Sequence, residues 1–263
     1  MFHTTGVTTR VFVFGAMVLV LPEVVMADLV WDDGLPHHIT ETISDKVWVY
    51  NSFPADNPTQ VYLYEQGRID VLYVHGDGEV YIQEGSLAYL QPVDASIVEM
   101  SGGAVDETMW AGGHSTVTIT GGHIGGNLLG NEESEIVFWG TSVSGNFGLS
   151  NSSRGTLWGG DIGGELIVNA QSQLTVYGAD FVIDGNAVEY GTLTTGGRAY
   201  VEVRLAGILF DGSPLDNTLI MTQDASVVLI PEPCTVLLLL LSAMRLRQQV
   251  ACENKSGRGY VMT

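Results

Sequence analysis

The middle of the chain repeats itself every nineteen residues. Successive rows begin SIVEMSGG at Ser96, STVTITGG at Ser115 and SEIVFWGT at Ser134, and the rows RGTLWGG and SQLTVYG continue the same register. Glycine recurs at one position of each row, at Gly102, Gly121, Gly140, Gly159 and Gly178, and a sixth falls on Gly197. A repeat of this length indicates one structural unit per row, with each unit stacked on the next.

Apolar residues keep the same register in three further columns. The columns are Met100, Ile119, Phe138, Leu157 and Val176; Val105, Ile124, Val143, Ile162 and Phe181; and Met109, Leu128, Phe147 and Leu166. In STVTIT, Val117 and Ile119 alternate with threonines, which is the period of a half-buried strand. The Gly-Gly pairs favour turns over helix. We therefore predict an all-β, single-stranded, right-handed parallel β-helix with coils of about 19 residues.

The remaining segments are arranged around this solenoid. Residues 70–204 are expected to form the coils, preceded by an N-terminal segment and cap at 28–69. Residues 205–230 are expected to form a β cap, because an open solenoid end exposes a sheet edge.

Two outward-facing columns are the candidate ligand-binding surface. The columns hold Thr118, Thr156 and Thr175, and beside them Thr120, Trp139, Trp158 and Tyr177. Aromatic side chains on a rigid sheet can bind sugar rings or pack against a second copy of the protein. The alternatives are a ladder that only stiffens the sheet, or rings covered by the N-terminal segment. Ice binding is not expected, because among the repeated rows only STVTIT carries the Thr-x-Thr pattern.

The chain is strongly acidic, with a formal net charge of −20. Between Asp28 and Ile230, 27 acidic residues face five basic ones, so this region carries −22. Such a surface repels nucleic acid, and no nucleic-acid partner is expected. It can attract Ca²⁺ weakly, but no cofactor and no specific metal site is predicted. His37 and His38 beside Asp32 and Asp33 could bind a metal or simply form a solvated loop.

No familiar catalytic motif is visible, such as Gly-x-Ser-x-Gly, His-Glu-x-x-His or a phosphate loop. A β-helix polysaccharide lyase or hydrolase is the enzymatic alternative, and such enzymes line a cleft with paired carboxylates or basic residues. The repeated rows contain no insertion that would raise a cleft wall, and the basic residues needed beside a polyuronate are few. We expect a protein that is not an enzyme and has no catalytic residue.

The first 27 residues read as a secretory signal peptide. Arg10 precedes an apolar run from Val11 to Leu21, and a small residue, Ala27, stands before Asp28. A signal helix is expected here, with signal peptidase cutting between Ala27 and Asp28. A membrane anchor is the alternative, although the run is short for a bilayer of about 30 Å.

A second apolar segment lies near the C-terminus, in PEPCTVLLLLLSAMRLR at 231–247. The eleven residues from Cys234 to Met244 predict a hydrophobic helix but are few for a permanent span, which takes about 20. Arg245 and Arg247 supply positive charge that stays on the cytoplasmic side. We expect transient or terminal membrane association, followed by a basic-polar tail at 248–263.

Pro231, Glu232 and Pro233, the apolar block and the basic cluster resemble the PEP-CTERM sorting signal. The same region is also described as an ice-binding protein C-terminal domain, a label that does not imply ice binding. The resemblance implies a Gram-negative export processed by exosortase, a membrane cysteine transpeptidase, and linked to extracellular polysaccharide or biofilm matrix. Pro231, Glu232 and Pro233 would be the recognition motif. The chain continues for sixteen residues past the basic cluster, and a tail that only anchors the protein is the alternative.

These features together predict an exported protein of the cell envelope, cell surface or extracellular matrix. Its expected role is structural or adhesive, with a carbohydrate-binding module as the alternative beside the enzyme.

Overall fold

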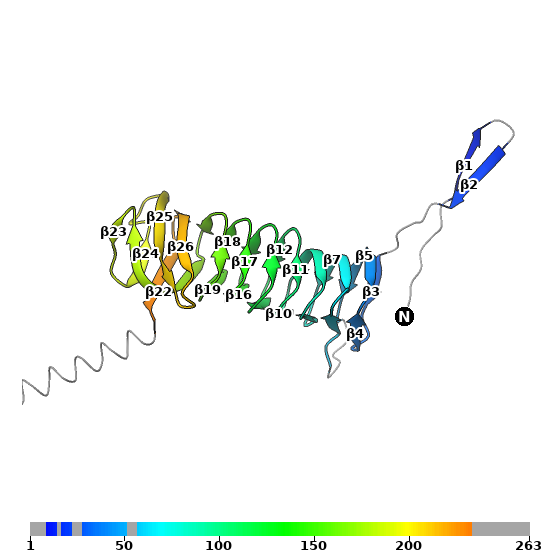
Figure 1. The fold of residues 1–263 in the computed structure, drawn as a ribbon, viewed down its shortest axis with the longest axis horizontal. Coiled ribbons are helices and arrows are strands. Elements are labelled where there is room, and N and C mark those ends of the chain that lie inside the picture. The colour runs from blue at the N-terminus through cyan, green and yellow to red at the C-terminus, as the bar shows by residue number, and fades with distance from the viewer. Residues whose placement is uncertain (1–8, 15–16, 23–27, 52–56, 233–263) are drawn as a thin grey trace, which may run out of the picture.

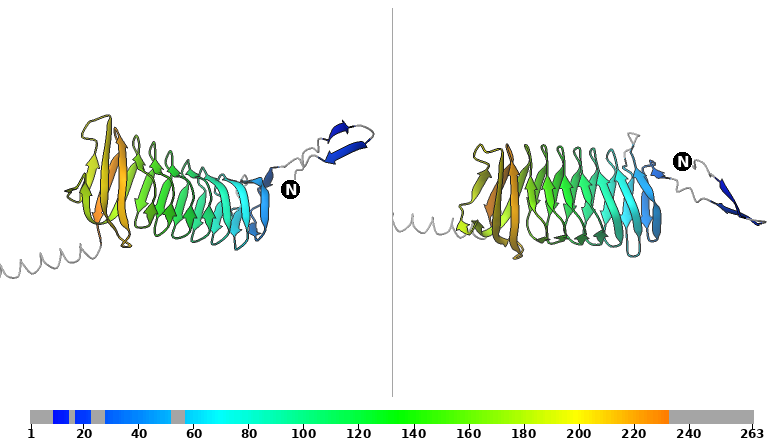
Figure 2. Two further views of the ribbon diagram at one scale, coloured as in Figure 1. Left: turned by 45° about the horizontal axis from the view of Figure 1, so that its top comes forward. Right: turned by 90° about the horizontal axis from the view of Figure 1, so that it is seen from above.

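The computed structural model describes residues 9–14, 17–22, 28–51 and 57–232. Within these residues the chain is all-β, and its body is a parallel β-solenoid of about eight turns with about 19 residues each (Figure 1). Figure 2 shows the coils stacked into a rod, with the longer strands of a cap at one end. The predicted all-β parallel solenoid is therefore confirmed.

One sheet, which we call the first sheet, runs the length of the rod. Its strands are β4 (Pro36–Ile39), β6 (Gln60–Leu63), β8 (Glu79–Ile82), β10 (Ile97–Met100), β13 (Thr116–Ile119), β16 (Glu135–Phe138), β19 (Arg154–Leu157), β22 (Gln173–Ile183) and β27 (Ser226–Pro231). Neighbouring strands pair in parallel, and Thr116 lies between Ile97 and Glu135. The nineteen-residue repeat is thus the length of one coil.

The other side of each coil changes along the rod. In the first coils it is one strand, namely β3 (Leu29–Trp31), β5 (Thr42–Val49), β7 (Arg68–Val74) and β9 (Ser86–Pro92). After β9 it divides into two short strands per coil. The pairs are β11 (Ala104–Val105) with β12 (Met109–Ala111), β14 (His123–Ile124) with β15 (Leu128–Gly130), β17 (Ser142–Val143) with β18 (Phe147–Leu149), and β20 (Asp161–Ile162) with β21 (Leu166–Val168).

The parallel coils begin earlier than the expected start at Asp70. β3 already pairs in parallel with β5, and β4 with β6. The pattern is hard to detect in the sequence because its spacing varies there. Leu29 pairs with Val47, eighteen residues on, but Val47 pairs with Leu72, twenty-five residues on. The segment 28–69 therefore supplies coils of the solenoid itself.

The C-terminal end differs from the expected plan of regular coils up to residue 204. β22 continues to Ile183, with a register shift against β25 between Ala179 and Val182, and turns back through Asp184 and Gly185, whose φ angles are 50° and 79°. Two successive positive φ angles are typical of tight hairpin turns with an Asp-Gly sequence. The antiparallel strands that follow are β23 (Asn186–Ala187), β24 (Gly191–Thr194) and β25 (Tyr200–Leu209). Gly197, the sixth glycine of the repeat, lies in the turn before β25 rather than in a coil.

The chain then returns to the solenoid. β26 (Pro214–Thr222) pairs antiparallel with β25 and in parallel with β21, and β27 pairs in parallel with β22. The cap is therefore an antiparallel excursion inserted before the last rung.

The sequence predicts a helix near each end of the chain, and the structure describes only the N-terminal of these two segments. Within residues 9–22 the structure has β1 (Thr9–Phe14) and β2 (Met17–Pro22) paired antiparallel, where a signal helix was expected. Their sequences, TRVFVF and MVLVLP, are rich in the β-branched and aromatic residues that favour strands. The expected C-terminal helix lies outside the described residues.

The core fills the inside of the coils. All the members of the three apolar columns are buried, from Met100 and Val105 in one coil to Val176 and Phe181 at the other end. Each apolar residue stacks on its counterpart from the next coil, since neighbouring strands of a sheet lie about 4.8 Å apart. The outward side chains of the first sheet are thereby held in straight rows.

Candidate binding surface

The outward side chains of the first sheet form the candidate surface, which we call the aromatic–threonine face. Pairing in register places the first row in the order His38, Tyr62, Tyr81, Glu99, Thr118, Val137, Thr156 and Thr175. Two residues further along each strand lies the second row, in the order Tyr64, Gln83, Ser101, Thr120, Trp139, Trp158 and Tyr177. The expected threonine and aromatic residues therefore share one face.

The expected aromatic ladder is formed by three consecutive coils. The ring centroids of Trp139 and Trp158 lie 5.5 Å apart with an interplanar angle of 18°. Trp158 and Tyr177 lie 3.6 Å apart and nearly parallel, at 5°. Trp139 leaves 42% of its surface exposed, while Trp158 and Tyr177 are half-buried. The ladder is open to solvent at its Trp139 end.

The cap covers one edge of this ladder. The Phe210 ring stands edge-on to Trp139 and to Trp158, with centroid distances of 5.6 Å to both. Its loop is tied down, because the Gly160 amide donates to Asp211 Oδ2 at 2.8 Å and the Ser213 hydroxyl donates to the Gly160 carbonyl at 2.9 Å. The cover therefore comes from the C-terminal cap and not from the N-terminal segment.

A second aromatic stack lies upstream on the same face, and the sequence analysis missed it. His38, Tyr62 and Tyr81 stack in register, with centroid distances of 5.1 Å and 4.8 Å. The Tyr81 hydroxyl donates to Glu79 Oε2 at 2.8 Å, which holds the ring in place. Burial, this hydrogen bond and the charges of Glu79 and Glu99 raise the pKa of Tyr81, so its hydroxyl remains a donor. The available signal was the nineteen-residue step from Tyr62 to Tyr81.

Another cluster of stacked rings lies on the strands β5 and β7. Trp48 stacks on Tyr73 at 4.1 Å and on Tyr50 at 6.1 Å, and Tyr50 stacks on His75 at 4.8 Å. It belongs to the other side of the coil, so it does not extend the aromatic–threonine face. Trp48 and Tyr73 are twenty-five residues apart, which hid the pair from a search at period nineteen.

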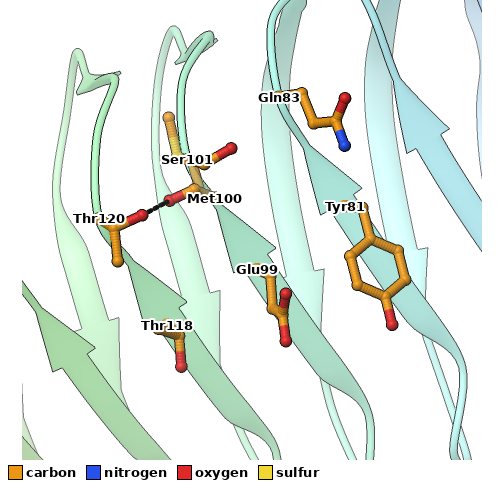
Figure 3. A pocket seen from close by; sticks show the side chains of 7 residues that line it. All are labelled: Tyr81, Gln83, Glu99, Met100, Ser101, Thr118 and Thr120. Atoms are coloured by element: carbon orange, nitrogen blue, oxygen red, sulfur yellow. Dashed lines mark hydrogen bonds between the residues drawn. The ribbon is translucent and has the colours of Figure 1, made fainter.

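A depression separates the two stacks on the aromatic–threonine face. Its volume is about 130 Å³, and its lining residues are Tyr81, Gln83, Glu99, Met100, Ser101, Thr118 and Thr120. Figure 3 shows these side chains on, or directly after, β8, β10 and β13, with Tyr81 at one side and Thr118 and Thr120 at the other. It exists because the coils of β10 and β13 carry no aromatic ring on this face, whereas Tyr81 lies on β8 and Trp139 directly follows β16. Thr118 and Thr120 thus line a hollow, while Thr156 and Thr175 lie beside the ladder.

The histidines expected near acidic residues do not form a common site. His37 Nε2 lies 3.1 Å from Asp33 Oδ1, and the His37 ring stacks on Trp31 at 4.3 Å. His38 instead stacks on Tyr62, because adjacent residues of β4 point to opposite sides. Among the described residues, no group of three or more His, Cys, Asp or Glu side chains is arranged to hold a metal ion.

The residues expected for sorting are only partly described. Pro231 ends β27 and Glu232 follows it, whereas Ala27, Pro233, Arg245 and Arg247 lie outside the described residues. Asp28 accepts a hydrogen bond from Trp48 Nε1 at 3.3 Å. In the part of the chain that the structure describes, no helix has the length and apolar character needed to cross a membrane.

Comparisons with known proteins found no match for this chain. No family model matches it, and neither a curated protein nor a solved structure matches it. The resemblance to PEP-CTERM proteins therefore has no family match behind it and remains a prediction from residues 231–247.

Proposed function

We propose that this protein is an exported, non-enzymatic scaffold of the cell surface or extracellular matrix that holds polysaccharide on its aromatic–threonine face. Its export would use the signal peptide and signal peptidase, and its sorting the PEP-CTERM-like tail and an exosortase-type enzyme. The observation that carries the binding role is the ladder of Trp139, Trp158 and Tyr177, which is open to solvent at its Trp139 end.

The ladder suits a long, repetitive ligand better than a small one. Its rings are held by three consecutive parallel coils, so a chain lying along the rod would meet an aromatic side chain at each of these coils. Sugar rings present apolar CH faces and hydroxyl edges, which match the free face of Trp139, the edges of the stacked rings and the threonine hydroxyls beside them. A β-helix lyase or hydrolase remains the enzymatic alternative, and cleavage of the bound polysaccharide would favour it.

The test is the binding of soluble polysaccharides to the purified protein, measured by affinity electrophoresis and by tryptophan fluorescence. The variant Trp139→Ala/Trp158→Ala should lose most of the gel retardation and the fluorescence response, because the ladder loses both indole rings. Trp110→Ala is the matched control, since Trp110 lies on β12, away from this face.

Thermal unfolding of each variant shows whether the fold is retained. If the double variant unfolds, Trp139→Ala replaces it in the binding test, because Trp139 is the more exposed of the two side chains and its loss should disturb the fold less. An unmodified protein that binds none of a broad panel of polysaccharides would overturn the binding role.

A further inference from the structure

We propose that the depression between the two aromatic stacks is a saccharide subsite that selects uncharged sugar units over uronic acids. Tyr81 would serve as its stacking platform and Glu99 as its acceptor for sugar hydroxyl groups. This inference rests on the proposed polysaccharide binding and adds to it a place, a set of contacts and a ligand class.

The stacking geometry leaves free ring faces beside the depression. In a stacked row each ring covers a face of its neighbour, so only the end rings keep a face without a ring contact. Tyr81 stacks on Tyr62 alone, and the next residue of its row is Glu99. Trp139 stacks on Trp158, is met edge-on by Phe210, and is preceded in its row by Thr120. Among the described residues, each stack thus presents its uncovered end toward the depression.

The size of the depression fits one unit of a longer chain. Its volume of about 130 Å³ is well below the 300–1,000 Å³ or so of pockets that enclose a whole small molecule. Three coil spacings separate β8 from β16, which amounts to roughly 14 Å at about 4.8 Å per strand. A sugar unit seated there could continue in both directions along the face, toward Tyr62 and toward Trp158.

The polar side chains in the depression are available to a ligand. Upstream, the outward polar groups are paired with one another: Gln60 Nε2 donates to Glu79 at 2.7 Å and the Tyr62 hydroxyl to Gln60 at 3.1 Å. In the depression, the side chains of Gln83, Glu99, Ser101 and Thr118 have no hydrogen-bond partner among the described residues; Figure 3 draws a single bond, from Thr120 Oγ1 to the Met100 carbonyl at 3.4 Å. An unpaired carboxylate, amide and two hydroxyls beside an aromatic ring form a suitable set for sugar hydroxyl groups.

The charge of the face sets the ligand class. Glu79, Glu99 and Glu135 project from the same sheet; Glu79 and Glu135 share a row in which Arg154 follows Glu135, and Glu99 lies in the row of Tyr81 and Thr118. A uronic acid would bring its carboxylate against Glu99, where like charges repel. A sugar hydroxyl would instead donate to the Glu99 carboxylate in a charge-assisted hydrogen bond. Uncharged polysaccharides should therefore bind better than polyuronates.

The experiment compares full-chain variants against hydroxyethylcellulose, a galactomannan and polygalacturonate by affinity electrophoresis. Tyr81→Ala should weaken binding of an uncharged polysaccharide about tenfold, the loss expected for one stacked ring and its buried area. Glu99→Gln should weaken binding of the uncharged polysaccharide severalfold, because it removes the charge-assisted hydrogen bond. It should also reduce the ratio between the affinities for uncharged polysaccharide and for polygalacturonate, because it removes the charge that repels a uronic acid. The control variants are Tyr200→Ala in the cap and Glu107→Gln on another side of the coil. They should change neither the affinity for the uncharged polysaccharide nor its preference over polygalacturonate.

The outcomes separate this inference from the proposed function. If Trp139→Ala/Trp158→Ala loses binding while Tyr81→Ala and Glu99→Gln bind as tightly as the unmodified protein, the subsite is overturned and the binding role stands. Tighter binding of polygalacturonate than of both uncharged polymers would overturn the ligand class. If the unmodified protein binds none of the three, the subsite is overturned, and the broad panel of polysaccharides decides the binding role. Glu99→Gln alters an exposed side chain, so it remains informative even if Tyr81→Ala fails to fold.

Discussion

A column of buried serines occupies one turn of each regular coil. Ser96, Ser115, Ser134, Ser153 and Ser172 are all fully buried, and each follows by two residues a position with positive φ. Their hydroxyls differ in hydrogen bonding. The Ser153 hydroxyl donates to the Ser150 carbonyl at 2.9 Å and accepts from the Ser150 amide at 3.0 Å, whereas Ser115 Oγ has no hydrogen-bond partner among the residues that the structure describes. Equal burial with unequal pairing makes this column a test of what a buried hydroxyl contributes.

Replacing these two serines by alanine should have different effects. Ser153→Ala should lower the free energy of unfolding by about 1 kcal/mol, because it removes a hydrogen bond in the core. Ser115→Ala should be neutral or slightly stabilising, since it removes an unpaired buried hydroxyl at a site of the same shape. Urea unfolding followed by circular dichroism measures both, and an equal loss for the two variants would contradict the assignment.

At the scale of the elements, the turns after β13 and β16 use glycine for two different reasons. At Gly121 a Cβ atom would lie 2.5 Å from the Ser101 carbonyl oxygen of the preceding coil. At Gly140 the nearest atom, the Thr120 carbonyl oxygen, would be 3.9 Å away, but φ is +68°. One glycine is therefore needed for close approach between coils and the other for a left-handed backbone.

Alanine substitutions should reveal this difference between the turns. Gly121→Ala should destabilise the protein by about 2–3 kcal/mol, because the backbone of the neighbouring coil must move. Gly140→Ala should cost only about 1 kcal/mol, the strain of a left-handed alanine in open space. The shift in the midpoint of urea unfolding orders the two, and a larger loss for Gly140→Ala would refute the assignment.

At the scale of the whole molecule, the solenoid and its cap lie between the two expected processing points. Asp28 directly precedes β3, the first strand of the coils, and Pro231 ends β27, the last strand of the first sheet. Cleavage before Asp28 and after the Pro231–Pro233 triplet would therefore remove no strand of the solenoid. The folded body can be complete before either end is processed.

Intact-mass analysis of the protein from its host's envelope and medium tests the proposed sorting. A mature form that starts at Asp28 and ends near Pro233 is expected. Glu232→Ala/Pro233→Ala should keep the C-terminal tail while still losing residues 1–27, because only the sorting motif is altered. A native protein that retains Thr263 would mean that the tail anchors the protein or is not processed.

The sequence by itself determined the solenoid and its inward columns. Met100, Ile119 and Phe138 could be assigned to the core because a coil of constant length turns sequence period directly into stacking. For the same reason Trp139, Trp158 and Tyr177 could be placed in one outward row. Where the coil length is constant, local pattern and tertiary contact carry the same information.

Only the tertiary structure decided the features that depart from the nineteen-residue period. The coils before Asp70 were hidden because the step from Val47 to Leu72 is longer than one repeat. Phe210 covers the ladder because the antiparallel excursion brings it back against Trp158, which lies 52 residues earlier in the chain. The depression beside Tyr81 exists only through the sizes of side chains on three neighbouring coils. Such contacts depend on how the chain folds back in space, which no local periodicity records.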